Sequence, residues 1–199
     1  MRHLIILTAF AIVAACATGA TGPGAADRFD SFRATETRDF RGYDKVYLAP
    51  PVAGPEVLAR VETRRLRSNE RPIGARDITD MLGELNEDLE RELGRVAELV
   101  DGPGPGILTV RTTLTDLNAN RPTQTELAMQ PGLTMNSIAS GDSAVQIQLL
   151  EDGRLLAEIR DRDNIDTLID QGVINAGVWV TARQHFSQVA SRLAALLSD

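Results

Sequence analysis

A regular apolar stripe between Ala75 and Val100 constrains the fold of this chain more than any other feature. Its members recur at spacings of three and four residues: Ile78, Leu82, Leu85, Leu89, Leu93 and Val96. This period places them on one face of an α-helix, which must bury that face against another element. The run GPGPG at residues 102–106 cannot continue a helix. The pattern therefore predicts one long amphipathic helix over residues 75–100.

A second helix and several strands are predicted in the rest of the chain. A similar apolar stripe indicates the helix over roughly residues 176–198. Alternation of apolar and polar side chains predicts strands at residues 43–52, 107–117, 145–149 and 155–159. The last two form a hairpin, because Asp152-Gly153 between them is typical of a tight turn. Residues 56–67 have an ambiguous period and fit either a helix or an extended arm.

The order strand, helix, strand, hairpin, helix indicates an α+β domain. We expect a single antiparallel or mixed sheet of about four strands, with two long helices packed on one face. We expect one domain over residues 42–199, since a hydrophobic fraction of 43% is enough to build a core. The net charge of −7 argues against nucleic acid as a partner, because phosphates require a basic patch.

The first fifteen residues are typical of an export signal. A short basic head, Arg2-His3, precedes an apolar run of ten residues, Leu4–Val13, which is too short to span a bilayer. Val13-Ala14-Ala15-Cys16 then resembles the lipobox of bacterial lipoproteins, in which the cysteine is acylated and becomes the N-terminus. The alternative is an ordinary signal peptide, or a membrane anchor, with an incidental cysteine.

Cys16 is the only cysteine, so its acylation leaves the domain no disulfide, thiol nucleophile or thiolate metal site. Several acyl chains hold a protein firmly on a membrane, whereas one binds weakly. Ala17, rather than aspartate, follows Cys16, and by resemblance to the sorting rule of such lipoproteins this indicates the outer membrane. We expect residues 16–41 to be a flexible tether, because ATGATGPGAA at 17–26 is small and Gly-rich. The end of this stretch, residues 27–41, has spaced phenylalanines and could pack along the domain edge.

The stretches LTVRTTLTDLNANRPT (108–123) and SAVQIQLLEDGRLLAEIRDRD (143–163) resemble the DUF3313 family of bacterial lipoproteins. Shared features are an opening strand ending in proline, YDKVYLAP, a strand ending in Thr115-Asp116 with Pro122 soon after, and a hairpin turn containing Asp152-Gly153. The turn EDGRLL departs from the family's more usual form. The resemblance implies a lipoprotein of the envelope and no established activity.

No catalytic residues and no cofactor are predicted. His185 is the only histidine after residue 16, and we expect it to be a surface or capping residue. SGDS at 140–143 is typical of a turn leading into a strand. Asp161, Asp163 and Asp166 resemble the start of a calcium loop, but the glycine and glutamate of such a loop are missing. We expect a solvated acidic strand end, with these three as weak metal candidates.

The polar stretch at residues 118–136 is the best candidate for partner recognition. Long loops in compact domains are uncommon and are often functional, although a plain connection is the alternative. Arg121 could pair with a carboxylate or phosphate on a partner, and Gln124 and Glu126 lie beside it.

The sequence therefore favours a non-enzymatic lipoprotein, held by its N-terminal lipid and facing the periplasm from the outer membrane. Its domain would bind or scaffold an unidentified envelope protein. A carboxylate-based envelope hydrolase is an alternative and would need two converging carboxylates in one pocket. A carrier of an apolar small molecule is another and would need an apolar cavity between helices and sheet.

Overall fold

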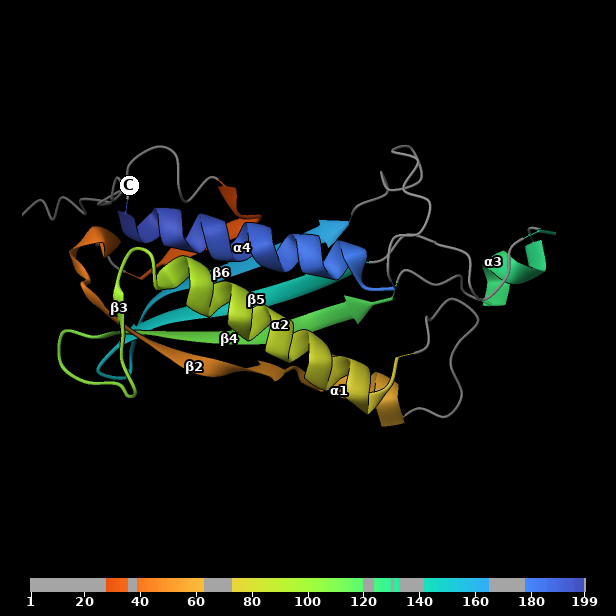
Figure 1. Ribbon diagram of the computed structural model, residues 1–199, viewed down its shortest axis with the longest axis horizontal. Helices are drawn as coiled ribbons and strands as arrows, with labels where there is room; N and C mark the ends of the chain where they lie inside the picture. Colours follow the sequence, from red (N-terminus) through yellow and green to blue (C-terminus); the bar gives the residue numbers. More distant parts are fainter. Residues whose placement is uncertain are drawn as a thin grey trace, which may run out of the picture.

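A computed structural model describes residues 28–35, 39–62, 73–119, 124–129, 131–132, 142–164 and 178–198. They form an α+β fold built on one mixed sheet with the strand order β1-β6-β5-β4-β2-β3 (Figure 1). In these described segments the strands are β1 (Ser31–Ala34), β2 (Lys45–Ala53), β3 (Glu98–Leu99), β4 (Leu108–Asn118), β5 (Asp142–Glu151) and β6 (Arg154–Asn164). The helices are α1 (Pro55–Glu62), α2 (Ala75–Leu93), α3 (Gln124–Met129), α4 (Val180–Ser198) and the short 3₁₀ helix η2 (Phe40–Gly42).

The middle of the sheet confirms the predicted strands and hairpin. β4, β5 and β6 are antiparallel neighbours, and the turn from β5 to β6 uses Asp152 and Gly153 at φ 49° and 78°. Positive φ at both positions is the geometry that the pair Asp-Gly favours. β2 runs parallel to β4 on one side and to β3 on the other, so the sheet is mixed.

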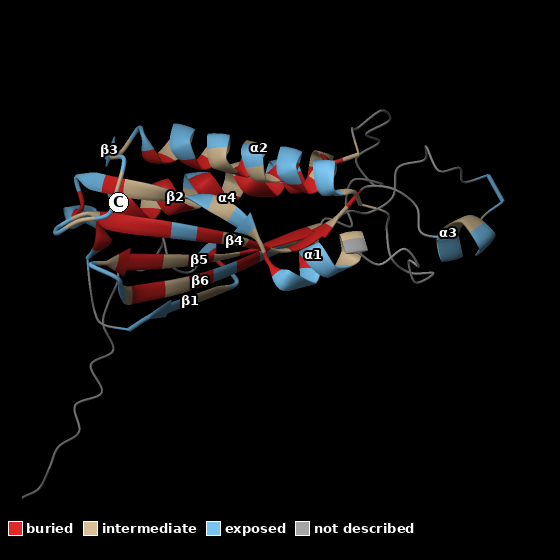
Figure 2. Cartoon of the chain, turned by 90° about the horizontal axis from the view of Figure 1, so that it is seen from below, coloured by how far each residue is buried: buried red, intermediate tan, exposed pale blue. Residues whose placement is uncertain are grey.

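The two long helices α2 and α4 lie together on one face of the sheet (Figure 2). Their apolar stripes and the inward side chains of β2, β4, β5 and β6 form one continuous core. Its largest fully buried side chains include Leu85, Leu89, Phe186, Leu114 and Ile147. On the opposite face of the sheet α1 is the one helix among the described residues, and it packs only at the far end (Figure 2).

The first long helix is shorter than predicted. It ends at Leu93, and Glu98–Leu99 leave it to pair as β3 with Lys45 and Val46 at the start of β2. Gly94 closes α2, with no room beside it for a side chain: a Cβ there would lie 2.8 Å from the carbonyl oxygen of Glu90. The second helix is described from Val180, and residues 176–177 lie outside the described segments.

The sheet has two more strands among the described residues than expected, β1 and β3. β1 falls within the stretch 16–41 that was predicted as a tether. It pairs antiparallel with β6, while Phe29 and Phe40 are buried and Phe32 packs edge-to-face on Phe40 with ring centroids 6.2 Å apart. Aromatic burial therefore holds the end of the predicted tether on the domain.

The two short helices α1 and α3 are the remaining elements. α1 shows that the ambiguous stretch 56–67 begins as a helix; residues 63–67 lie outside the described part. α3 lies within the predicted recognition stretch 118–136, and Figure 1 draws it beyond the end of the sheet. No helix among the described residues is long and apolar enough to cross a membrane.

Candidate functional site

The strand register places two polar side chains among the core residues beneath α4. On β5, Ser143 shares the inward face with Val145 and Ile147, and on β6 Asp161 lies directly opposite Val145. α4 supplies His185 from its buried side. Ser143, His185 and Asp161 are 0%, 1% and 3% exposed, so they are core residues by burial.

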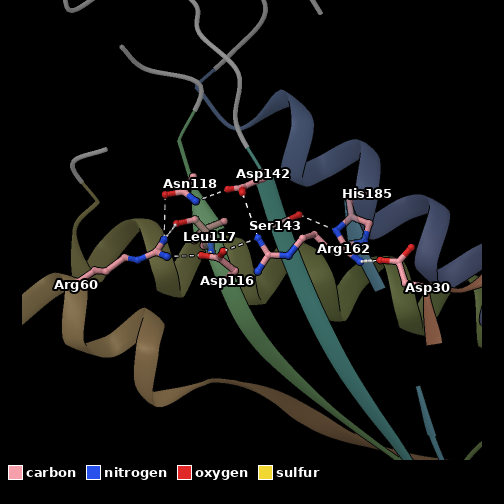
Figure 3. Close-up of polar contacts among 9 residues, drawn as sticks. All are labelled: Asp30, Arg60, Asp116, Leu117, Asn118, Asp142, Ser143, Arg162 and His185. Carbon is pink, nitrogen blue, oxygen red and sulfur yellow. Dashed lines mark hydrogen bonds and ion pairs between the residues drawn. The ribbon is translucent and has the colours of Figure 1, made fainter. Parts of the chain in front are cut away.

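These three side chains form a line of hydrogen bonds. Ser143 Oγ lies 2.7 Å from His185 Nδ1, and His185 Nε2 lies 3.1 Å from Asp161 Oδ2 (Figure 3 draws the Ser143 contact). A carboxylate only accepts, so Nε2 carries the hydrogen that is donated to Asp161. With that tautomer Nδ1 accepts from the Ser143 hydroxyl, and a single ring proton satisfies both contacts.

Asp161 has further partners on both of its carboxylate oxygens. Arg192 Nη1 of α4 donates to Oδ2 at 2.9 Å, and the backbone N–H of Asp30 donates to Oδ1 at 3.2 Å. The carboxylate of Asp30 accepts in turn from the backbone N–H of Arg162 at 2.8 Å. We call Ser143, Asp161, His185 and Arg192 the inner polar cluster. It joins α4, β5 and β6, and it holds the residue that precedes β1.

The inner cluster has the residue types of a hydrolytic triad, but its geometry favours a structural role. A triad serine must contact substrate, whereas Ser143 is fully buried beneath α4. Asp161 is already paired with a guanidinium as well as the imidazole. A buried carboxylate with this many donors is well compensated for its desolvation, and it fixes the position of the helix that supplies two of them.

Near this cluster, the pKa of Asp163 is raised above its ordinary value of 3.8. Burial of its carboxyl is the main cause, and the negative charges of Asp161 and Asp30 act in the same direction. The positive charges of a protonated His185 and of Arg192 oppose the rise. Asp163 lies on the inward side of β6, two residues after Asp161, and is half-buried.

A second group of charges lies on the opposite face of the same strands. An irregularity in β4 between Leu114 and Asp116 turns Asp116 to this face, opposite Ala144, which in turn lies opposite Arg162. Because Ala144 is small, Arg162 reaches across β5, and its Nη1 lies 3.0 Å from Asp116 Oδ2.

Arg60 of α1 completes this outer polar cluster, which consists of Arg60, Asp116, Asn118, Asp142 and Arg162 (Figure 3). Its Nη2 lies 2.5 Å from Asp116 Oδ1, and its Nη1 donates to the carbonyl of Leu117 at 2.9 Å. Asp142 accepts from Asn118 and lies 3.4 Å from Arg162 Nη1. The outer polar cluster lies at the end of the sheet where β4 ends and β5 begins.

The structure describes only some of the predicted site residues. Cys16, Arg121 and Asp166 lie outside the described residues. Gln124 is exposed at the start of α3, and Glu126 is in the same helix. The expectation of a solvated acidic strand end is wrong for Asp161, which is 3% exposed and pairs with His185 and Arg192. Within the described segments no three potential metal-ligating His, Cys, Asp or Glu side chains converge.

The expectation that His185 is a surface or capping residue is wrong, because it is 1% exposed and lies in the core. The signal that could have placed it is its position on the apolar stripe of α4, three residues after Ala182 and four before Val189. The same reasoning applies to Ser143 and Asp161, which continue the inward-facing alternation of their strands.

Two kinds of protein are among the solved structures that match this chain. The PelC dodecamer from Paraburkholderia phytofirmans matches in two crystal forms, one of them a point variant. Both have a TM-score of 0.43 and 10% identity, with 82% and 81% of this chain and 96% and 97% of that chain covered. Protein XCC0632 from Xanthomonas campestris, of the DUF330 family, matches at a TM-score of 0.45 and 16% identity, covering 77% of this chain and 84% of that chain. No curated protein matches the sequence.

The sequence itself gives the clearest relationship. The model of the family described as "Protein of unknown function (DUF3313)" matches residues 24–193, which include every described strand and most of α4. The chain therefore belongs to the DUF3313 family.

Proposed function

We propose that this chain is a lipid-anchored protein of the bacterial outer membrane whose periplasmic domain binds an envelope protein and performs no catalysis. Acylation of Cys16 holds the domain at the membrane, and the stretch around α3 contacts the partner. The membrane anchor, the partner and the absence of catalysis are all parts of this proposal.

The observation that carries the binding function is the position of α3. This helix lies beyond the end of the sheet (Figure 1), and its described side chains are exposed or half-buried. Met129 at its end is 76% exposed, more than any other large apolar side chain in the described segments. Exposed methionine adapts to varied surfaces, and interface cores are enriched in it. Gln124, five residues earlier at the start of α3, adds an exposed polar side chain.

The burial of the inner polar cluster supports a binding role over a catalytic one. Its serine, histidine and aspartate are inside the core, where they bond to one another rather than to a substrate. The cluster keeps α4 and the start of β1 in place, which suits a rigid platform.

The anchor is tested by replacing Cys16 with alanine and fractionating cells. We expect the native chain to be acylated, processed and recovered with outer membranes, and the Cys16→Ala chain to lose all three properties. A Cys16→Ala chain that is still processed and still partitions with outer membranes contradicts the lipid anchor.

The partner surface is tested by photo-crosslinking in intact cells. A crosslinking amino acid at Gln124 or Met129 should yield a discrete adduct with one envelope protein. The matched control is Arg76, an exposed residue on α2, where the same adduct should be absent. Equal adducts at all three positions, or none at α3, would refute recognition by this stretch.

A carboxylate-based hydrolase is the second candidate, and Asp163 is the observation that favours it. Its raised pKa beside Asp161 is the kind of perturbation that catalytic acids show. Purified peptidoglycan is a suitable probe: release of soluble fragments by the native chain but not by Asp163→Asn would favour the enzyme over the binding protein.

A further inference from the structure

The face of the sheet opposite α2 and α4, which we call the open face, presents an excess of positive charge. A row of residues paired across four strands runs from Arg111 on β4 through Gln148 and Glu158 to Arg33 on β1. Arg111 and Arg33 are exposed, and neither has an ion-pair or hydrogen-bond partner among the described residues. Glu158 is paired with Arg160, its neighbour on the same face, at 2.9 Å.

The other charges on this face of the strands cancel in pairs. Asp116 lies between Arg60 and Arg162, and Asp142 is also within reach of Arg162. Arg33 and Arg111 are therefore left over, which gives this face two uncompensated positive charges on a chain whose net charge is −7.

The helical side of the domain has the opposite charge. α2 contains seven acidic and two basic residues, and α4 adds two arginines and no acidic residue, so the two helices together have a net charge of −3. Charge is thus segregated across the sheet, with a negative helix layer on one side and a positive open sheet face on the other (Figure 2 shows the two sides). A separated charge distribution of this kind orients a protein in the field of a charged surface.

We propose that the open face of the sheet docks on the anionic lipid headgroups of the membrane that anchors the protein, with Arg33 and Arg111 as its contacts. This orientation turns α2 and its negative charge away from the membrane. The inference deepens the proposed function, because it rests on the anchor bringing the domain to that surface.

The chain enters the fold at a place that suits this arrangement. Eleven residues separate Cys16 from Arg28, and the Gly-rich tether expected from their sequence would span about 17–20 Å. The first strand after it is β1, which carries Arg33 at the edge of the open face. The domain is therefore confined near the headgroups, where two weak contacts act at high effective concentration.

A second copy of the chain fits this face less well than a membrane does. The complementary negative surface on another copy is α2, where several charges are already paired with neighbours, such as Glu84 with Arg183 and Glu92 with Arg95. Burying such a densely charged surface carries a large desolvation cost. Headgroup phosphates attract arginine at the membrane surface without a close-packed interface.

Orientation on vesicles tests the proposal directly. A cysteine introduced at Gln148 on the open face, or at Glu87 on α2, gives one labelling site, because Cys16 is the only native cysteine and is acylated or replaced. The labelled full chain is placed on vesicles of phosphatidylethanolamine and phosphatidylglycerol that carry a headgroup-linked quencher. We expect the label at Gln148 to be quenched much more than the label at Glu87.

The two arginines are tested against a matched charge change. Arg33→Gln with Arg111→Gln should abolish the difference between the two labels and weaken docking by about 25-fold, roughly fivefold for each arginine. Arg76→Gln with Arg95→Gln removes the same charge from the helical side and should leave the difference intact. High salt, or phosphatidylcholine vesicles, should also abolish it.

Equal quenching at the two positions on anionic vesicles, or a difference that survives loss of both arginines, overturns the inference. The same labels in the Cys16→Ala chain distinguish a failure of docking through the open face from a failure of the lipid anchor. If Cys16 carries no lipid, the anchor fails, while an arginine-dependent difference in quenching still supports docking through the open face. An equal effect of both arginine pairs indicates attraction by net charge alone and contradicts the assigned surface.

Discussion

One buried hydroxyl in the core has no acceptor among the described residues. Thr112 lies on the inward face of β4 opposite Ile147, is 2% exposed, and its Oγ1 makes no hydrogen bond there. An unsatisfied buried hydroxyl destabilises the folded state. Replacing it with a methyl group of similar shape should raise the free energy of unfolding, so Thr112→Val should gain about 1 kcal/mol in urea denaturation.

Thr115→Val is the control for this change, because Thr115 lies on the same strand and is only half-buried. Its effect should stay within about 0.5 kcal/mol. A loss of stability in Thr112→Val would show that the hydroxyl is satisfied in solution.

Asp163 makes the stability of the protein depend on pH in a defined direction. Its pKa is raised in the folded state, chiefly by burial, so the folded chain holds this proton more tightly than the unfolded chain does. The stability that it contributes is present below its ordinary pKa of 3.8 and is lost as pH rises through the higher folded-state pKa. At neutral pH the ionised side chain therefore destabilises the folded state.

Asp163→Asn should accordingly be more stable than the native protein at neutral pH, and the gain should disappear as pH falls below about 4. Denaturation at a series of pH values measures it. Asp80→Asn, at an exposed position on α2, is the control and should show no such pH dependence. A variant that is less stable at neutral pH would mean that the carboxylate is favourably paired in the fold.

At the scale of the residue, sequence patterns predict which polar side chains face the core, but not which groups they bond to. The inward position of Ser143 and Asp161 follows from two-residue alternation, and that of His185 follows from the helical stripe. Their hydrogen bonds do not follow, because strand register and the placement of α4 over β5 and β6 depend on packing of the whole core. Residue type alone suggested exposure, and the fold overrides that tendency by pairing the polar groups with one another.

The element most dependent on a few polar contacts is β1. It has four residues at the edge of the sheet, and the carboxylate of Asp30 just before it accepts from the backbone N–H of Arg162. Asp30→Ala removes this acceptor, so amide hydrogens of β1 should exchange roughly tenfold faster. Exchange in β4, at the centre of the sheet, should not change.

Asp39→Ala is the control for β1, since Asp39 pairs with Arg41 at the surface and makes no hydrogen bond or ion pair with the strand in the described part of the chain. Native-like exchange of β1 in Asp30→Ala would mean that the aromatic contacts of Phe29, Phe32 and Phe40 are sufficient to hold it.

Long elements were predictable and short ones were not, for a physical reason. α2, α4 and the β5–β6 hairpin each have several turns or alternations, so their periods stand out from the sequence. β1 has four residues and β3 has two, which is too few for a period, and both exist because a neighbouring strand offers an edge. After α2 ends at Leu93, Glu98 and Leu99 likewise pair with the edge of β2.

At the scale of the whole molecule, one core joins the sheet to both long helices. Residues of α2, α4 and four strands belong to the same buried cluster, and Trp179 at the start of α4 is part of it. Elements that share one core unfold together. Trp179 is the only tryptophan, so its fluorescence reports on the seating of α4, while far-ultraviolet circular dichroism reports on the helices and sheet together.

We expect the two signals to give the same midpoint in urea. Leu89→Ala, which opens a cavity in the fully buried face of α2, should lower both midpoints equally, at a cost of about 2–5 kcal/mol. Leu58→Ala on α1, a side chain that is 49% exposed, should have a much smaller effect. If the tryptophan signal changes at lower urea than the circular dichroism, α4 leaves the sheet before the rest unfolds. Release of α4 from the sheet would then be determined by the inner polar cluster rather than by the shared core.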